Sequence, residues 1–280
     1  MKIFFSHKCL EYRQEGHSES PARVKSIYKY IKDKFDFSEP ETCSDKDLLL
    51  CHDKDLINRI RHRKFSAADT PNLPGMFEFA KLAAGTAIQA AKHAVEKSEN
   101  SFSLMRPPGH HAGKNFLGGF CYFNSIAIAV KKMLEKVDKV AIIDIDGHHG
   151  NGTQDIFLGD ERVLFKSLHQ KNAFPVSGFV SDRNCYNYPL VPGTSGKDYL
   201  KIFSAALENA ENFGPDIIAV SAGFDAYKKD PLLELGLDIE TYFEIGDMIS
   251  QLGVPVFSVL EGGYSEDIDK CVYQFLKGLG

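Results

Sequence analysis

Residues 140–152 read Val-Ala-Ile-Ile-Asp-Ile-Asp-Gly-His-His-Gly-Asn-Gly, an apolar run that ends in two carboxylates, two imidazoles and three glycines. Such a run predicts a strand buried on both faces, as in a parallel sheet. Asp144, Asp146 and His148 alternate, so in a continued strand their side chains would share one face. Buried charges are costly unless they are paired or bound to metal, and Asp with His is a frequent ligand set for divalent metals. The stretch therefore predicts a metal-dependent hydrolase.

Strand and helix patterns alternate along the rest of the chain, which predicts a parallel sheet covered by helices on both faces. Strands are expected at 2–5, 101–105, 140–146, 163–168, 217–221 and 256–260. Helices are expected at 21–35, 54–63, 75–96, 124–135, 151–157, 197–213, 239–252 and from about 267 onward. No linker rich in Pro, Gly or Ser divides the chain, so residues 1–280 are predicted to form one α/β domain.

Composition excludes several classes of protein. The net charge of −5 gives no support for direct nucleic-acid binding. No run reaches the roughly 18 apolar residues of a membrane span, and the apolar N-terminal stretch is too short for a signal peptide. The six cysteines are scattered without a Cys-x-x-Cys pair, which indicates reduced thiols in a cytoplasmic protein.

Polar side chains follow five of the predicted strands, next to glycines or other turn residues. The five segments are 106–111, 144–152, 167–169, 222–225 and 261–264. Ligands of open parallel sheets bind beyond the carboxyl ends of the strands, so we expect these segments to meet at one edge. Each residue alone has a structural explanation: Asp146 could cap a helix, Asp225 could form a loop turn, and Tyr264 could lie in the core. Their joint occurrence favours a functional site.

Five segments of the chain resemble, in the same order, the zinc-dependent histone deacetylase and acetylpolyamine amidohydrolase family. They are Arg-Pro-Pro-Gly-His-His-Ala (106–112), Gly-Gly-Phe-Cys-Tyr-Phe-Asn (118–124), Asp-Ile-Asp-Gly-His-His-Gly-Asn-Gly-Thr-Gln (144–154), Ser-Ala-Gly-Phe-Asp (221–225) and Leu-Glu-Gly-Gly-Tyr (260–264). The form of the first segment, together with Asn151, is similar to the class II branch. The resemblance implies the arginase–deacetylase fold, a three-layer α/β/α sandwich with a mainly parallel central sheet.

The resemblance also implies a metal site. It places zinc on Asp146, His148 and Asp225, a ligand set that would also accept Fe(II). It moves Asp144 from a candidate ligand to the partner of His110. A monovalent cation, K⁺, is implied beneath the zinc, bound largely through backbone oxygens. The residues implied for that second site are Asp144, Asp146, His148, Ser167 and Leu168.

The implied reaction is hydrolysis of an amide by a water that the metal activates. His111 matches the general base for that water and the acid for the leaving amine. Asn151 lies behind His111, where class I members carry Asp, and an amide stabilises a charged imidazole less than a carboxylate does. Tyr264 matches the hydroxyl that donates to the tetrahedral oxyanion.

Further matching positions imply a substrate tunnel. Gly119, Phe120 and Phe174 match its wall, where an apolar slot would bury a methylene chain. Asp69 matches a rim residue that holds the substrate backbone, and Arg23 matches an arginine beside the channel for the released acid. Polyamine-specific relatives carry a glutamate at the position of Leu232, which argues against strict polyamine specificity. The family's dimerising insertions are absent, so we expect a monomer.

Three functions remain open at this stage. The leading hypothesis is a zinc amidohydrolase that removes acetyl or other short acyl groups from lysine side chains of proteins or peptides. The second is a deacetylase of small acylated amines such as acetylpolyamines. The third is a catalytically silent acyl-lysine binding module, which the intact His110, His111 and Tyr264 disfavour. A serine hydrolase lacks its Gly-x-Ser-x-Gly motif, and the glycine motifs of nucleotide sites are absent.

Overall fold

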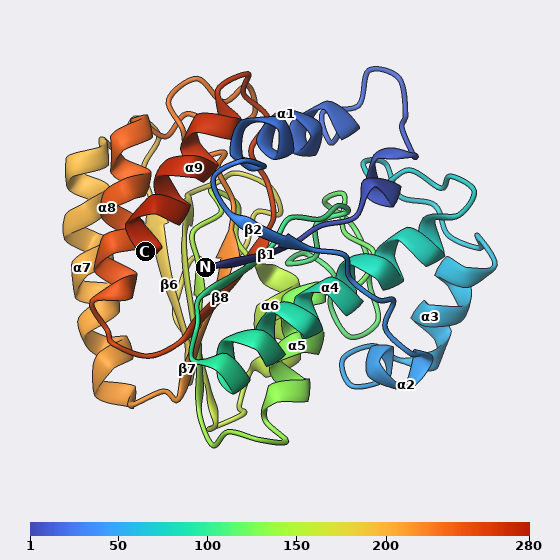
Figure 1. Ribbon diagram of the computed structural model, residues 1–280, viewed down its shortest axis with the longest axis horizontal. Coiled ribbons are helices and arrows are strands. Elements are labelled where there is room, and N and C mark those ends of the chain that lie inside the picture. Colours follow the sequence, from blue (N-terminus) through green and yellow to red (C-terminus); the bar gives the residue numbers. More distant parts are fainter.

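A parallel sheet of eight strands crosses the molecule in the order β2-β1-β3-β8-β7-β4-β5-β6 (Figure 1). The structure is a computed structural model that describes residues 1–280. The strands are β1 (Lys2–Phe4), β2 (Asp36–Ser38), β3 (Ser101–Ser103), β4 (Val140–Asp144), β5 (Val163–Gln170), β6 (Cys185–Leu190), β7 (Ile217–Ala222) and β8 (Val256–Leu260). Every pair of neighbouring strands is parallel, so the sheet is wholly rather than mainly parallel.

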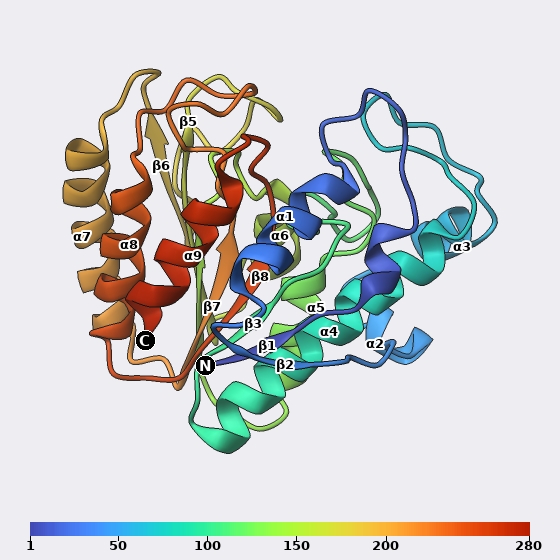
Figure 2. The ribbon, with the colours of Figure 1, turned by 45° about the horizontal axis from the view of Figure 1, so that its top comes forward.

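Helices cover both faces of the sheet, which confirms the predicted three-layer α/β/α architecture (Figures 1 and 2). One face carries α1 (Pro21–Ile31), α7 (Gly196–Phe213), α8 (Ile239–Ser250) and α9 (Ile268–Leu279). The other carries α2 (Asp45–Leu48), α3 (Lys54–Arg61), α4 (Met76–Lys97), α5 (Ser125–Met133) and α6 (Asn151–Phe157). A short 3₁₀ helix, η1 (His7–Leu10), follows β1. None of the helices combines the length and apolar character needed to span a bilayer.

Two apolar cores lie on opposite faces of the sheet. In β4, Ala141 and Ile143 belong to the core beneath α7, α8 and α9, whereas Val140 and Ile142 belong to the core beneath α4 and α5. Both faces of this strand are therefore buried, which is why its sequence is continuously apolar. All six cysteines are buried and free.

The sequence predictions differ from the structure mainly at the edges of the sheet. The edge strands β2 and β6 were not predicted; β6 contains Pro189, which a strand tolerates at an edge because its missing N–H is not needed there. The predicted strand through residue 146 is too long. β4 ends at Asp144, whose Oδ1 accepts the backbone N–H of Asp146 at 3.1 Å and turns the chain out of the sheet.

Candidate metal centre and active site

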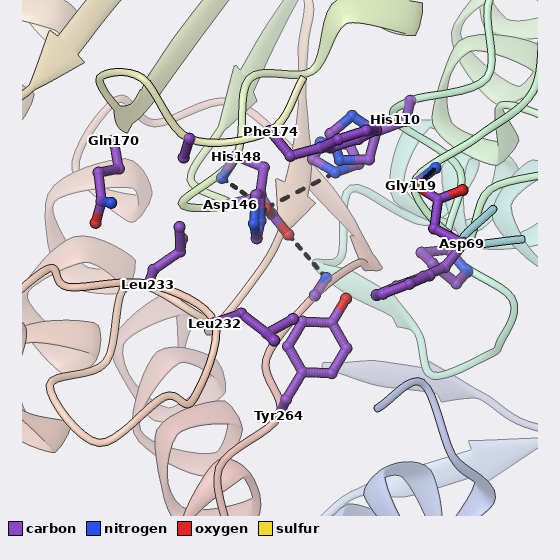
Figure 3. Close-up of a pocket in the computed structure, with 15 residues that line it drawn as sticks. Asp69, His110, Gly119, Asp146, His148, Gln170, Phe174, Leu232, Leu233 and Tyr264 are labelled. Atoms are coloured by element: carbon purple, nitrogen blue, oxygen red, sulfur yellow. Dashed lines mark hydrogen bonds and ion pairs between the residues drawn. The ribbon is translucent and has the colours of Figure 1, made fainter. Parts of the chain in front are cut away.

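A cavity of about 360 Å³ opens beyond the carboxyl ends of the central strands (Figure 3). It receives side chains from the loops that follow β3, β4, β5, β7 and β8. The lining residues are Asp69, Pro108, His110, His111, Gly119, Phe120, Asp146, His148, Gln170, Ala173, Phe174, Leu232, Leu233, Gly262 and Tyr264. The predicted segments 106–111, 144–152 and 261–264 thus meet at this cavity, whereas its lining from β5 and β7 comes from residues beyond the segments 167–169 and 222–225.

Asp146, His148 and Asp225 form a cluster at the floor of this cavity. Their potential ligand atoms all lie within 4.8 Å of one another. His148 Nδ1 lies 2.8 Å from Asp225 Oδ2 and 3.2 Å from Asp146 Oδ1. Backbone N–H groups orient the carboxylates, since Gly262 donates to Asp146 Oδ2 at 2.8 Å and Gly147 donates to Asp225 Oδ1 at 2.6 Å. Two carboxylates and one imidazole in this arrangement could hold a divalent metal.

The backbone leaves room for the cluster only because two neighbours are glycines. A Cβ on Gly223 would lie 2.0 Å from Asp146 Oδ2, and one on Gly262 would lie 2.5 Å from Asp225 Oδ2. Any side chain at either position would displace the carboxylates. The glycines in these two strand-end segments are therefore required by the cluster itself.

The electrostatics of the cluster favour positive charge between the carboxylates. Burial opposes a charge on His148, but Asp225 and Asp146 outweigh it and raise the pKa of His148 well above its usual range. Burial and the neighbouring Asp146 raise the pKa of Asp225. The same field that favours a proton on the imidazole favours a bound cation, so the donor set fits a metal site.

His110 and Asp144 form a buried ion pair next to the cluster. His110 Nδ1 donates to Asp144 Oδ2 at 3.0 Å, and His110 Nε2 lies 3.8 Å from Asp146 Oδ1. Burial disfavours the charged imidazole, but Asp146 and Asp144 together raise the pKa of His110 to about 10. Asp144 faces His110 rather than the cluster, so the structure removes it from the first set of three candidate ligands.

His111 differs from His110 in its partner and in its charge. Its Nδ1 lies 2.8 Å from Asn151 Oδ1. Because an amide oxygen only accepts, Nδ1 carries the hydrogen and Nε2 keeps its lone pair. Burial, followed by the charges of His110 and His148, lowers the pKa of His111 well below its usual range. The two adjacent histidines are thus held in opposite protonation states.

The loop that carries both histidines is held by buried polar groups. Glu261 Oε2 accepts the backbone N–H groups of Gly109 and His110 at 2.7 and 3.2 Å. Asn124, which caps α5 through Ala127, donates to the Ala112 carbonyl at 3.1 Å. Gly109 packs so closely on the start of α5 that a Cβ would lie 2.7 Å from the Ser125 nitrogen.

Tyr264 projects its hydroxyl into the cavity from the opposite side (Figure 3). The Arg23 guanidinium lies over its ring, 4.6 Å from the centroid. Arg23 is buried and donates to the Glu261 carbonyl at 2.7 Å and to Glu19 at 3.2 Å. A second hollow of about 270 Å³ is lined by both Arg23 and Tyr264.

The predicted tunnel residues surround the mouth of the cavity. Phe120 adopts a left-handed backbone with φ of 69°, which is strained for a side chain of this size. Its N–H donates to Thr70 Oγ1 at 3.0 Å, and the Gly119 N–H donates to Asp69 Oδ2 at 3.0 Å. Asp69 therefore shapes the wall directly, a contact that the sequence did not predict. Phe174 packs edge-on against His111, with centroids 5.0 Å apart.

The residues expected at a second cation site lie on β4, on β5 and in the loop after β4. Asp144 on β4 is paired in register with Ser167 on β5, and Leu168 follows directly. The Ser167 hydroxyl is engaged by His169 Nδ1 at 2.9 Å. Three of the five predicted residues thus lie on neighbouring strands, and Asp146 and His148 follow the end of β4.

A buried ion pair connects the N-terminal loop to the histidine loop. Arg106 donates from Nε and Nη2 to the two carboxylate oxygens of Glu19, each at 2.7 Å. It also donates from Nη1 to the carbonyls of Cys9 and Tyr12, each at 2.8 Å. Tyr12 in turn donates its hydroxyl to Glu19 at 3.1 Å.

Several residues around the site had no role in the sequence analysis. Asp230 and Glu261 are buried carboxylates that accept backbone N–H groups, and His149 lies between Ser177 Oγ at 2.7 Å and Gln154 Oε1 at 2.9 Å. Glu261 lies inside a segment that the sequence did single out. Asp230 had no signal beyond its nearness to Asp225, because its partners are backbone groups.

Comparison with known proteins gives a consistent result. A family model described as histone deacetylase domain matches residues 17–279. The chain is 37% identical to a probable deacetylase of Methanothermobacter thermautotrophicus, over 100% of this chain and 90% of that protein. It is 39% identical to acetylpolyamine amidohydrolase 1 of Pseudomonas aeruginosa, over 70% of this chain but only 60% of that protein. The crystal structure of an acetylpolyamine aminohydrolase from Burkholderia pseudomallei, 25% identical, matches with a TM-score of 0.94 over 100% of this chain and 98% of that one.

Proposed function

Because the chain belongs to the histone deacetylase domain family, with the arginase–deacetylase fold, we propose that it is a zinc-dependent lysine deacylase formed by one catalytic domain. It removes acetyl or another short acyl group from lysine side chains of a protein or peptide. One observation carries the proposal: two residues of a potential metal cluster, a neutral histidine and a tyrosine border the same cavity.

Asp146, His148 and Asp225 would hold the metal through two carboxylates and one imidazole. This set suits zinc and also accepts Fe(II). When bound, the metal polarises the amide carbonyl and lowers the pKa of a water molecule.

His111 is the proton carrier in this proposal. Its Nε2 lone pair faces the cavity because Asn151 accepts the hydrogen on Nδ1. It takes a proton from the attacking water and later returns it to the leaving amine. Burial, together with the positive charge on the neighbouring His110 that Asp144 stabilises, keeps His111 neutral before the reaction.

Tyr264 donates its hydroxyl to the oxygen that becomes negative in the tetrahedral intermediate. Burial raises the pKa of Tyr264 well above its usual range, so the hydroxyl keeps its proton. The Arg23 guanidinium behind the ring would attract the released carboxylate into the adjoining hollow. Backbone oxygens around Asp144 and Ser167 would hold the monovalent cation, K⁺.

The mouth of the cavity favours a substrate with an apolar chain. Phe120 and Phe174 would enclose the methylene groups of a lysine side chain, whose burial is favourable. Asp69 retains free lone pairs with which to accept a substrate N–H. Outside the slot, Leu232 is 41% exposed, and Val176 is exposed on the loop that carries Phe174.

A small acylated amine is the second candidate substrate. The names of relatives from Pseudomonas aeruginosa and Mycoplana ramosa specify acetylpolyamines, which favours it. The apolar Leu232 at the rim weighs against it, because a polyamine carries a second cation that gains nothing from an apolar contact.

A substrate panel tests the proposal. Protein reconstituted separately with zinc and Fe(II) is incubated with acetyl-lysine and longer-acyl-lysine peptides and with acetylpolyamines. We expect the peptides to have the higher kcat/KM, and the activity to disappear with a strong chelator. Hydrolysis of acetylpolyamines alone would replace the first candidate by the second, and activity that a chelator leaves intact would contradict both.

A further inference from the structure

Asp230 is a buried carboxylate that the proposed mechanism leaves without a role. It is 7% exposed and lies on the loop after β7. Its Oδ2 accepts the backbone N–H of Tyr264 at 2.7 Å, and its Oδ1 accepts the backbone N–H of Leu232 at 2.9 Å. One side chain thus binds the backbone of the residue that carries the cavity hydroxyl and of the residue that forms the rim.

The backbone before Tyr264 needs such a restraint. Gly262 and Gly263 precede it, and Gly263 adopts a φ of 109°, which only glycine readily adopts. Both glycines are kept by close packing, Gly262 against the metal cluster and Gly263 against Phe224. Glycines restrict the chain least, so an anchor immediately after them helps to fix the tyrosine, together with Arg23, whose Nε donates to the Gly263 carbonyl at 2.5 Å and whose guanidinium lies over the ring.

Bonds from N–H groups to a carboxylate are roughly twice as strong as neutral ones, which makes Asp230 an effective anchor. Its carboxylate is costly to bury, and burial followed by the nearby Asp225 raises its pKa to about 7, while Arg23 acts in the opposite direction. A carboxylate that stays buried despite this desolvation cost, with both oxygens accepting hydrogen bonds, has a specific structural role.

We propose that Asp230 is a positioning residue that fixes Tyr264 and Leu232 relative to each other. This inference rests on the proposed function, in which Tyr264 stabilises the oxyanion and Leu232 contacts the outer part of the substrate. Leu232 and Tyr264 lie side by side at the cavity (Figure 3). Because Asp230 binds both backbones, it couples the position of Leu232 at the rim to the position of the Tyr264 hydroxyl.

A double-mutant cycle separates this role from general stability. Asp230→Asn keeps the size of the side chain but replaces one acceptor oxygen by an NH₂ group. We expect it to lower kcat by about tenfold to a hundredfold, since a misplacement near 1 Å has that effect. In a Tyr264→Phe background the same change should lower kcat no further. An equal loss in both backgrounds would overturn the proposal.

Amide hydrogen exchange gives a readout that does not require activity. In Asp230→Asn the amide of Leu232 or of Tyr264, whichever faces the new NH₂ group, should exchange at least tenfold faster, with unchanged metal content. If the exchange rate of neither amide changes, the proposed role of Asp230 is refuted, whichever substrate the protein hydrolyses. A wild-type protein that hydrolyses no acyl amide would refute the proposed function and leave this second test decisive for Asp230.

Asp216 provides a control with the same kind of contact at an exposed position. Its carboxylate also accepts two backbone N–H groups, from Asp138 and Lys139, each at 2.9 Å, but at the start of β7, the opposite end from the cavity. Asp216→Asn should leave kcat and the two amides unchanged. If Asp230→Asn does not fold, Asp230→Glu keeps the charge while moving the carboxylate, and the same cycle and exchange measurement apply to it.

Discussion

His111 Nδ1 lies 2.8 Å from Asn151 Oδ1, and Asn151 is the first residue of helix α6. The amide orients the imidazole without adding charge, whereas a carboxylate at this position would stabilise the imidazolium form. Burial and the charges of His110 and His148 lower the pKa of the proposed base, and this one side chain adjusts it further.

Asn151→Asp should raise the pKa of His111, because a carboxylate within hydrogen-bond distance favours the charged ring by about one unit or more. His111 acts as a base when neutral, so the acid limb of the kcat/KM profile should move to higher pH by the same amount. Profiles from the lowest pH at which both proteins stay folded up to pH 9 measure the shift. Asn58→Asp, on the exposed face of α3, adds the same charge away from the site and should leave the profile unchanged.

Zinc should stabilise the folded protein, because a ligand that binds only the folded state at 100 times its Kd adds about 2.7 kcal/mol. For a protein of this size that corresponds to several degrees in Tm. Asp225→Asn removes one charged ligand and should abolish the increase. Asp267→Asn changes a carboxylate outside the cavity, so this variant should retain the zinc-dependent increase in Tm. Thermal melts with and without zinc measure this effect. An unchanged Tm of the wild-type protein would contradict the metal site.

Leu232→Glu should shift substrate preference toward a monoacetylated diamine over an acetyl-lysine peptide. The new carboxylate would lie at an exposed rim, where an ion pair contributes up to about 1 kcal/mol, or about fivefold in the ratio of kcat/KM values. Leu232→Gln has a similar size without the charge and separates electrostatics from the loss of the apolar side chain. A Gln variant with the same shift would assign the effect to the leucine contact instead.

His52 should make the protein less stable in mild acid. It is 2% exposed, its Nδ1 donates to the Gly113 carbonyl at 2.8 Å, and its Nε2 accepts the Asn124 N–H at 2.9 Å. Burial lowers its pKa to about 4. Below pH about 6.5 the unfolded state binds a proton that the folded state excludes, so the free energy of unfolding falls until pH about 4 and then levels off.

From pH 7 to pH 5 the contribution of His52 should be about 2 kcal/mol. Urea unfolding of the wild type and of His52→Gln at both pH values measures it, because the variant cannot titrate there. Burial lowers the pKa values of His149 and His169 as well, so only the difference between the two proteins isolates His52. If the free energy of unfolding changed equally with pH in both proteins, the assignment of this pH dependence to His52 would be refuted.

The central strands could be predicted from sequence because burial on both faces makes them continuously apolar. The edge strands could not, since β2 is short and partly exposed and β6 mixes tyrosines with Pro189. The end of β4 depends on the hydrogen bond from the Asp146 N–H to Asp144, which no periodicity reveals. The confirmed architecture therefore follows from the interior of the sheet rather than from its borders.

The residues of the candidate site also divide into those that the sequence predicts and those that it does not. Side chains that face the cavity could be found because they gather after strand ends in the sequence. Asp230 could not, because its partner Tyr264 lies 34 positions away and contributes a backbone N–H, which every residue but proline carries. The contact of Asp69 with Gly119 could not be predicted for the same reason, because it also involves a backbone N–H. The sequence suggests what a carboxylate can bind but not which backbone amide it contacts.

The pairing of Arg106 with Glu19 has a practical consequence for engineering. Tyr12 and Glu19 are both held by Arg106, whereas residues 13–16 between them are exposed, and His17 packs against Phe120 at the cavity mouth. A loop closed at its base in this way is an Ω-type segment that tolerates replacement. Residues 13–16 can therefore be varied in libraries while Arg106 keeps Glu19 and the histidine loop in place.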